Sequence, residues 1–297
     1  MLPAVLSVVL AAASPSAAPE ITVEAERLTE QQIEAKARDF IRDVLPIPAY
    51  GQYARWTQPV CPKVAGIADV YAAMVETRVR AAATAAGVPL APPGCRTNLS
   101  ITFSEDARVT AGIIARRKPR LVAKLDGLQQ DRLFNAALPV RWWHVSEPTD
   151  DNGLPATSAT VLMTTQTFGG QSLAESLPIN PDTIMTGSYN SSLIDTNLKI
   201  GVTGAVVLVD IPLATGKPLD AVADYVALVA LAPAKLPPEL PGVPSILGLF
   251  GSNGGAAALT GWDKAYLAAL YRIQLNRNAN RQRGQLVGAI KASFAPD

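Results

Sequence analysis

Residues 219–231 read LDAVADYVALVAL, and this stretch decides where the interior of the protein lies. Only Asp220 and Asp224 interrupt a segment that is apolar on every side, which is typical of a helix buried in a protein core. Asp220, in the first turn, is explained by the positive end of the helix. Asp224 is different, because a buried carboxylate must be hydrogen-bonded, ion-paired or protonated. We therefore expect Asp224 in either an interhelical polar contact or a functional site.

The segments on either side of this helix complete a recognisable order. A valine-rich strand is predicted at Val202–Pro212, and Pro218 begins the buried helix. A proline-rich loop, Pro233–Pro244, follows. Next come a tight turn at Ser245-Ile246-Leu247 and a final pair of helices that begins at Thr260, breaks near residues 276–280 and runs toward Phe294.

This order resembles the C-terminal half of the metzincin-type zincins and of secreted bacterial proteins that share that outline. In that family the buried helix carries HExxH, whose two histidines bind zinc from one helix face while the glutamate works on a water. The resemblance places Ala223 and Ala227 at the two histidine positions and Asp224 at the glutamate. It also places Leu247 where a methionine is usual in the turn, and Leu270-Tyr271 at the end of the closing helix.

The residue inventory excludes zinc-dependent proteolysis. A catalytic zinc needs three protein ligands and an open position, but the chain contains one histidine, His144. The resemblance therefore implies a zincin-like body without its metal, and no cofactor is expected. No GxSxG or SxxK motif offers another nucleophile. His144 itself lies in a predicted strand, Val140–Ser146, where we expect it to be packed or hydrogen-bonded. Trp142 and Trp143 in the same strand point to opposite faces of the sheet, which leaves open whether one of them is an exposed binding aromatic.

The N-terminal part contains a removable leader and a cysteine pair. Residues 1–18 resemble a signal peptide, because the apolar run Leu2–Ala13 is too short to span a bilayer and small residues follow it. In an exported protein, Cys61 and Cys95 are most simply a disulfide. No later run approaches eighteen apolar residues, so no membrane span is expected in the mature chain. We predict a periplasmic or secreted protein.

Periodicity predicts further elements of an α+β fold, with a mixed sheet packed against buried helices and a helical C-terminal end. Residues 19–297 are expected to form one zincin-like domain. The predicted helices and strands include a short strand at 20–26, a helix opened by a Thr29–Gln32 capping box, a helix at Asp69–Ala86 stopped by Gly87, a strand at Asn98–Phe103, helix and loop at 108–138 with a basic cluster at 116–118, and strands at 140–146 and 156–165 joined by a turn at 150–153.

Charge excludes some partners. Lys and Arg total 26 against 25 Asp and Glu, a net charge of +1, which provides no general attraction to nucleic acid or to an anionic membrane. Local cations near the C-terminus, Arg272 to Lys291, fit a solvated helix end. The polar stretch 169–197, with Tyr189 in a turn position, is expected to form a surface excursion that could contact a ligand.

Three functions follow as hypotheses. The first is a non-catalytic exported binding protein for a peptide, a glycan or an envelope protein, with Asp224, Asp220 and Tyr189 as candidate binding residues. The second is a hydrolase that uses Asp224 with Asp220 or Asp210 as acid and base. The third is a structural component of envelope assembly.

Overall fold

A computed structural model describes residues 28–48, 51–149, 198–252 and 254–295, together with four short strand segments at 157–158, 167–168, 171–172 and 184–185. The predicted leader, the predicted strand at 20–26, the turn at 150–153 and Tyr189 lie outside the described residues, as does most of the predicted strand at 156–165.

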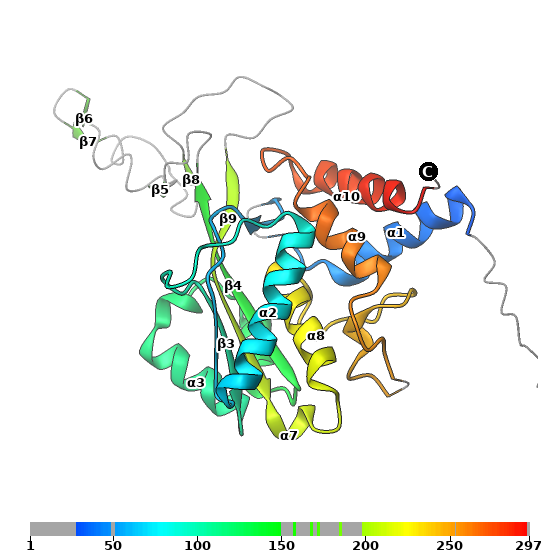
Figure 1. Cartoon of the computed structure of the whole chain (residues 1–297). Helices are drawn as coiled ribbons and strands as arrows, with labels where there is room; N and C mark the ends of the chain where they lie inside the picture. Colours follow the sequence, from blue (N-terminus) through cyan, green and yellow to red (C-terminus); the bar gives the residue numbers. More distant parts are fainter. Residues whose placement is uncertain are drawn as a thin grey trace, which may run out of the picture.

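A five-stranded mixed sheet forms the centre of the molecule (Figure 1). Strand β9 pairs in parallel with β3 and β1 and antiparallel with β4, and β2 pairs in parallel with β3. The valines of β9 suit a strand that is covered on both faces. The strands of this sheet are β1 (Arg55–Trp56), β2 (Pro62–Ala65), β3 (Leu99–Ser104), β4 (Val140–Thr149) and β9 (Lys199–Asp210). Two short pairs lie outside it: β5 (Thr157–Ser158) with β8 (Ile184–Met185), and β6 (Thr167–Phe168) with β7 (Gln171–Ser172).

Helices cover both faces of the sheet. Helices α2 and α8 lie on one face and α3 on the other (Figure 1). The larger apolar core joins the first face to α1, α9 and α10, and a smaller core packs α3 and α4 against Trp143, Val206 and Leu208. The helices are α1 (Glu30–Val44), α2 (Asp69–Ala86), α3 (Ala107–Arg117), α4 (Gly127–Asn135), α7 (Ile211–Ala214), α8 (Leu219–Leu231), α9 (Gly261–Leu270) and α10 (Ala279–Ser293), with 3-10 turns at Pro119–Leu121 and Ile246–Gly248. The fold class is α+β, as predicted.

The buried helix is confirmed. Helix α8 begins after Pro218 and ends at Leu231, and each residue from Ala221 to Leu231 is buried. Its neighbour α2 packs along it (Figure 1). In a helix surrounded in this way, the last carbonyl groups cannot hydrogen-bond to water, so side chains from other elements must donate to them.

Local signals set several helix ends as expected. Thr29 and Gln32 form the capping box of α1, and Gly87 ends α2 in the left-handed conformation, at φ 76°. Thr260 caps α9 through a second box completed by Asp263. In each case a hydrogen-bonding side chain or a glycine supplies what the helix end lacks.

The structure corrects one predicted boundary and adds two short strands. The strand predicted to reach Pro212 ends at Asp210, because Asp210 caps α7 and Pro212 fits its first turn. Strands β1 (Arg55–Trp56) and β2 (Pro62–Ala65) were not predicted. For Trp142 and Trp143, whose exposure the sequence left open, the structure gives burial (4% and 3% exposed), because helices cover both faces of the sheet.

Candidate functional site

The two predicted carboxylates of α8 are joined by one arginine of α2. The Arg78 guanidinium donates to Asp224 Oδ1 at 3.0 Å and lies 2.9 Å from Asp220 Oδ2. The second oxygen of Asp224 accepts the Leu259 amide at 3.0 Å, just before α9 begins. Asp224 is therefore an interhelical contact that joins α2, α8 and the start of α9, and both of its oxygens are occupied.

Asp210 lies elsewhere, at the C-terminal end of β9. Its carboxylate accepts the Leu213 amide at 3.2 Å and the Ala107 amide at 3.0 Å. It therefore caps α7 and provides a hydrogen-bond acceptor for the backbone amide of the first residue of α3. Buried Arg141 has a similar role at the other end of a helix, where it donates to the Leu133 and Ala136 carbonyls of α4.

His144 contacts the C-terminal end of α8. Its Nε2 lies 3.3 Å from the Ala230 carbonyl oxygen, and because a carbonyl only accepts, this nitrogen must carry the proton. Burial lowers the pKa of His144 from 6.5 to about 4, against smaller opposing effects of backbone hydrogen bonds. The imidazole is therefore neutral near pH 7 and holds a structural hydrogen bond, as expected for a strand histidine.

The turn that follows α8 is held by a buried carboxylate. Asp263 accepts the Ser245 hydroxyl at 2.6 Å, the Ile246 amide at 2.9 Å, and the Thr260 amide and hydroxyl at 2.9 and 2.8 Å. The turn and the closing helix are thus one hydrogen-bonded unit. Ala223 and Ala227 are fully buried, so the helix face that the resemblance assigns to zinc is packed rather than hollow.

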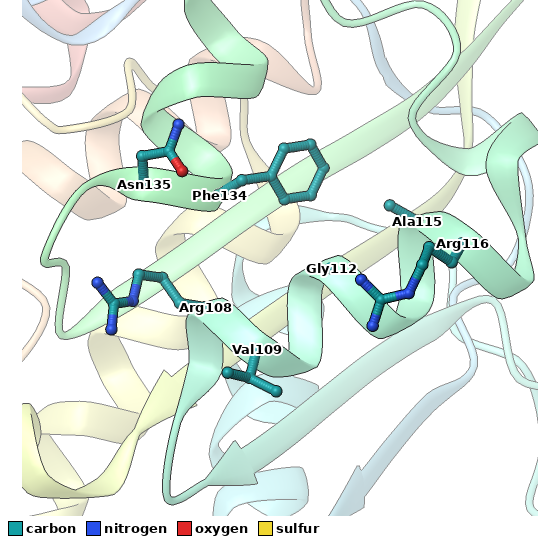
Figure 2. A pocket seen from close by; sticks show the side chains of 7 residues that line it. All are labelled: Arg108, Val109, Gly112, Ala115, Arg116, Phe134 and Asn135. Carbon is teal, nitrogen blue, oxygen red and sulfur yellow. The ribbon is translucent and has the colours of Figure 1, made fainter.

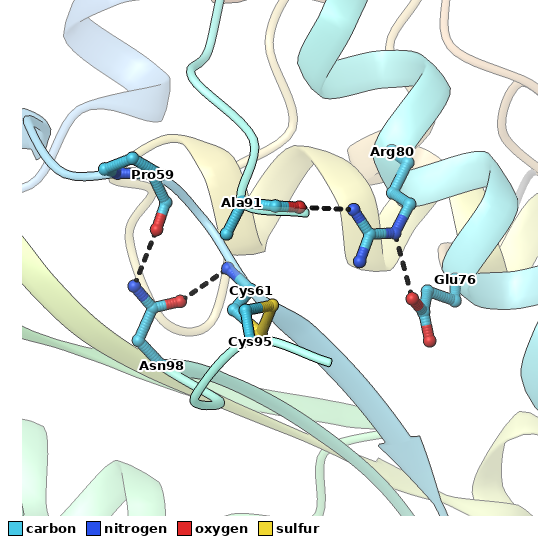
Figure 3. Close-up of a disulfide and its surroundings, with 7 residues drawn as sticks. All are labelled: Pro59, Cys61, Glu76, Arg80, Ala91, Cys95 and Asn98. Atoms are coloured by element: carbon cyan, nitrogen blue, oxygen red, sulfur yellow. Dashed lines mark hydrogen bonds and ion pairs between the residues drawn. A yellow bond between two sulfur atoms is a disulfide. The ribbon is translucent and has the colours of Figure 1, made fainter. Parts of the chain in front are cut away.

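The predicted disulfide is present. Cys61 and Cys95 are bonded, with their Cα atoms 6.1 Å apart. Figure 3 shows Asn98 beside it, donating to the Pro59 carbonyl at 3.0 Å and accepting the Cys61 amide at 2.7 Å. Arg80 of α2 donates to the Ala91 carbonyl at 3.2 Å and pairs with Glu76 (Figure 3). The loop that carries Cys95 is therefore held at several points.

A cavity of about 770 Å³ opens beside this bridge. We call it the disulfide-rimmed cavity, defined by the Cys95–Asn98 loop, the Gln58–Pro59 loop, the turn at Lys118–Leu121 and the sheet residues Ser100, Val145 and 203–206. It lies on the face of the sheet opposite α8, because Ser100 alternates with Leu99 and Ile101, which point into the larger core.

The lining of the disulfide-rimmed cavity is cationic and hydroxylated. Arg96 and Lys118 are exposed at its edge, and Ser100 and Thr203 contribute hydroxyls. None of the described residues that line it is an aspartate or a glutamate. Thr203 is the extra residue of a bulge between β4 and β9, where Val145 pairs with Gly204 and Ser146 with Val202. Bulges commonly redirect side chains beside binding sites.

Sequence reasoning missed this cavity. The available signal was weak: Ser100 on the polar face of a correctly predicted strand, next in the chain to the Cys95 bridge. Lys118 was noted only as part of a basic cluster. The pairing of β3 with β9 brings Ser100 beside Val206, about one hundred positions away in the chain, and no local pattern indicates this contact.

Two kinds of special site are absent from the part of the chain that the structure describes. Within it, no three His, Cys, Asp or Glu side chains come together as metal ligands. No described helix is long and apolar enough to cross a membrane.

Comparison with known proteins adds no family. No family model matches the chain, no curated protein matches it, and no solved structure matches it.

Proposed function

We propose that this chain is a non-catalytic exported binding protein that takes an anionic ligand in the disulfide-rimmed cavity. The observation that carries the proposal is the lining of this cavity. It has two cations at the edge and the hydroxyls of sheet residues, and no carboxylate occurs among the described residues that line it. Such a lining attracts a negative ligand and repels none of its charges. Leu121, Val145 and Val206 add apolar surface for the uncharged part of the ligand.

The proposal retains a zincin-like body as its scaffold. What supports it is the order of β9, the buried α8, the turn at Ile246–Gly248 and α9, with Asp263 joining the last two. The packing of Ala223 and Ala227 argues against a ligand at the former zinc position, so the proposed ligand site lies across the sheet.

The other two hypotheses lack a comparable observation. A hydrolase would need a free acid and base, but Asp220 and Asp224 share Arg78, and Asp210 accepts backbone amides at the starts of α7 and α3. These carboxylates hold the fold together. Export is part of the proposal, and the disulfide and the absence of a described membrane-spanning helix are compatible with it.

Calorimetric titration tests the binding site. The disulfide-intact protein would be titrated with an oligogalacturonate and with a short Glu-rich peptide, each compared with its neutral counterpart, an oligogalactose or a Gln-rich peptide. We expect binding of one acidic probe only, weakened at least tenfold by Arg96→Ala or Lys118→Ala, and weakened by salt. Arg38→Ala, an exposed cation of α1, is the matched control.

Two outcomes would overturn the proposal. Equal binding of acidic and neutral probes, or an Arg96→Ala protein that binds like the wild type, removes the cationic cavity as the ligand site. Zinc analysis of the exported protein tests the metal-free scaffold, since stoichiometric, tightly held zinc contradicts it. N-terminal sequencing of the periplasmic fraction tests export.

A further inference from the structure

A second hollow lies between α3 and α4. This α3–α4 groove has a volume of about 610 Å³ and is lined by Arg108, Val109, Gly112, Ala115 and Arg116 of α3 and by Phe134 and Asn135 of α4. Figure 2 shows Arg108 and Arg116 at opposite ends of the α3 segment, with Phe134 and Asn135 facing them from α4. Two guanidinium groups thus flank one opening.

Small residues keep the groove open. A Cβ atom added at Gly112 would meet only the Arg116 guanidinium, at 3.5 Å. Glycine in the middle of a helix disfavours the helix relative to alanine, so its presence here needs a reason other than helix formation. Gly112 and Ala115, which have little or no side chain, leave the space between the two arginines unfilled.

The surface around the groove combines positive charge with exposed apolar side chains. Residues 107–124 contain six Lys and Arg and no Asp or Glu, in a chain whose net charge is only +1. Within this segment, Arg108 lies 3.7 Å from the carboxylate of Asp106. Val109 and Ile113, one helical turn apart on α3, are 56% and 36% exposed. Leu128 of α4 is exposed as well.

This combination points to one kind of partner. A soluble anion would pair with the arginines but would leave Val109 and Ile113 in water. Helices that lie on a bilayer surface place apolar residues among basic ones in this way, because the acyl boundary covers the former and anionic headgroups attract the latter. Nucleic acid would match the charge but would give the aliphatic side chains nothing to contact.

We propose that the outer face of α3 docks on an anionic phospholipid bilayer. In this arrangement a headgroup phosphate occupies the α3–α4 groove between Arg108 and Arg116, while Val109 and Ile113 enter the headgroup boundary. This goes beyond the proposed function, since it uses another hollow and other residues. Binding through this face would be peripheral and reversible, because headgroup contacts and the shallow burial of two aliphatic side chains give only modest affinity.

Vesicle co-sedimentation of the exported protein tests the proposal. We expect binding to vesicles of phosphatidylglycerol and phosphatidylcholine, at least tenfold weaker binding to phosphatidylcholine alone, and loss of binding in high salt. Arg108→Gln/Arg116→Gln should weaken binding at least tenfold, and Val109→Ser/Ile113→Ser severalfold. Gly112→Leu, which fills the groove, should also weaken vesicle binding severalfold. Circular dichroism would show that each variant is folded.

The control is a change of equal charge on another surface. Arg272→Gln/Arg281→Gln removes two exposed cations near α10 and should leave binding unchanged. An equal loss in this control, or no preference for phosphatidylglycerol, overturns the proposal. Displacement from vesicles by inorganic phosphate beyond the effect of matched ionic strength assigns the groove to a soluble anion, which also overturns it. Arg96→Ala separates this test from the proposed function, since it should weaken ligand binding without changing vesicle binding.

Discussion

Trp56 and His144 meet at a single carbonyl oxygen, that of Ala230. The Trp56 indole donates to it at 2.9 Å, and His144 Nε2 lies 3.3 Å away. Ala230 is in the last turn of α8, where carbonyls have no partner within the helix. Strands β1 and β4, far apart in the chain, thus complete the same helix end. The next carbonyl, of Leu231, accepts the Tyr271 hydroxyl at 2.7 Å.

A shared acceptor predicts that the two side chains are coupled energetically. Either Trp56→Phe or His144→Phe leaves one donor on the Ala230 oxygen, whereas the double variant leaves a buried acceptor without one. An unsatisfied buried group costs about 1–3 kcal/mol. We expect the double variant to lose about 1 kcal/mol more free energy of unfolding than the sum of the single variants, measured by urea denaturation.

The matched control for this cycle uses a donor with its own acceptor. Tyr271→Phe removes the donor to the Leu231 carbonyl, so its cost should add to that of His144→Phe. Additivity in the Trp56–His144 pair would show that the shared oxygen does not couple them.

The same histidine should make stability depend on pH. Its pKa is about 4 in the folded protein and 6.5 in an unfolded chain. Between these values the unfolded state binds more protons, so the free energy of unfolding falls as the pH falls. We expect a loss of about 2 kcal/mol between pH 7.5 and pH 5. His144→Gln, which keeps a donor but does not titrate, should remove this slope. The assignment is direct because the chain has no second histidine, and an unchanged slope in the variant would contradict it.

Asp224 and Asp220 form a natural comparison, since both pair with Arg78. The side chain of Asp224 is 9% exposed and that of Asp220 is 53% exposed. Removing Asp224 takes away the acceptor of the Leu259 amide and leaves Arg78 with only the exposed Asp220, so Asp224→Ala should cost about 3 kcal/mol of unfolding free energy. Asp220→Ala should cost less than about 1 kcal/mol, as for exposed pairs. Thermal and urea unfolding of both variants would check this, and similar losses would mean that burial does not set the difference.

The disulfide joins residues 34 positions apart. In the chain-entropy treatment, closing such a loop stabilises the folded state by about 4 kcal/mol. Cys61→Ser/Cys95→Ser should lower the free energy of unfolding by about that amount, and reduced wild type should match the variant. Because the bridge borders the disulfide-rimmed cavity, binding of the acidic probe should also weaken. A variant as stable as the oxidised protein would indicate that the hydrogen bonds of Asn98 and Arg80 hold the loop without the bridge.

Local sequence signals were sufficient for most helices. The Thr29 box, the Gly87 stop and the helix from Pro218 to Leu231 are properties of a few neighbouring residues, and the structure has all three. The short strands at 55–56 and 62–65 were missed because two to four residues show no readable period. They are strands because β9 and β3 lie beside them.

The candidate site was less predictable. Asp224 was noticed because a carboxylate in an apolar helix is conspicuous, but its partner Arg78 lies in α2, 146 positions away. The disulfide-rimmed cavity joins loops, a turn and three strands. None of these segments is unusual alone, so no local pattern could indicate it.

The sequence by itself therefore determined a buried helix, a cysteine bridge and a histidine count too low for a catalytic zinc, because these depend on composition and short-range periodicity. Only the tertiary structure decided that the helix face with Ala223 and Ala227 is packed, that His144 and Trp56 share a carbonyl, and that cations gather around a cavity across the sheet. The physical reason is that these features arise from contacts between distant segments, which hydrophobic burial brings together without leaving a periodic trace in the chain.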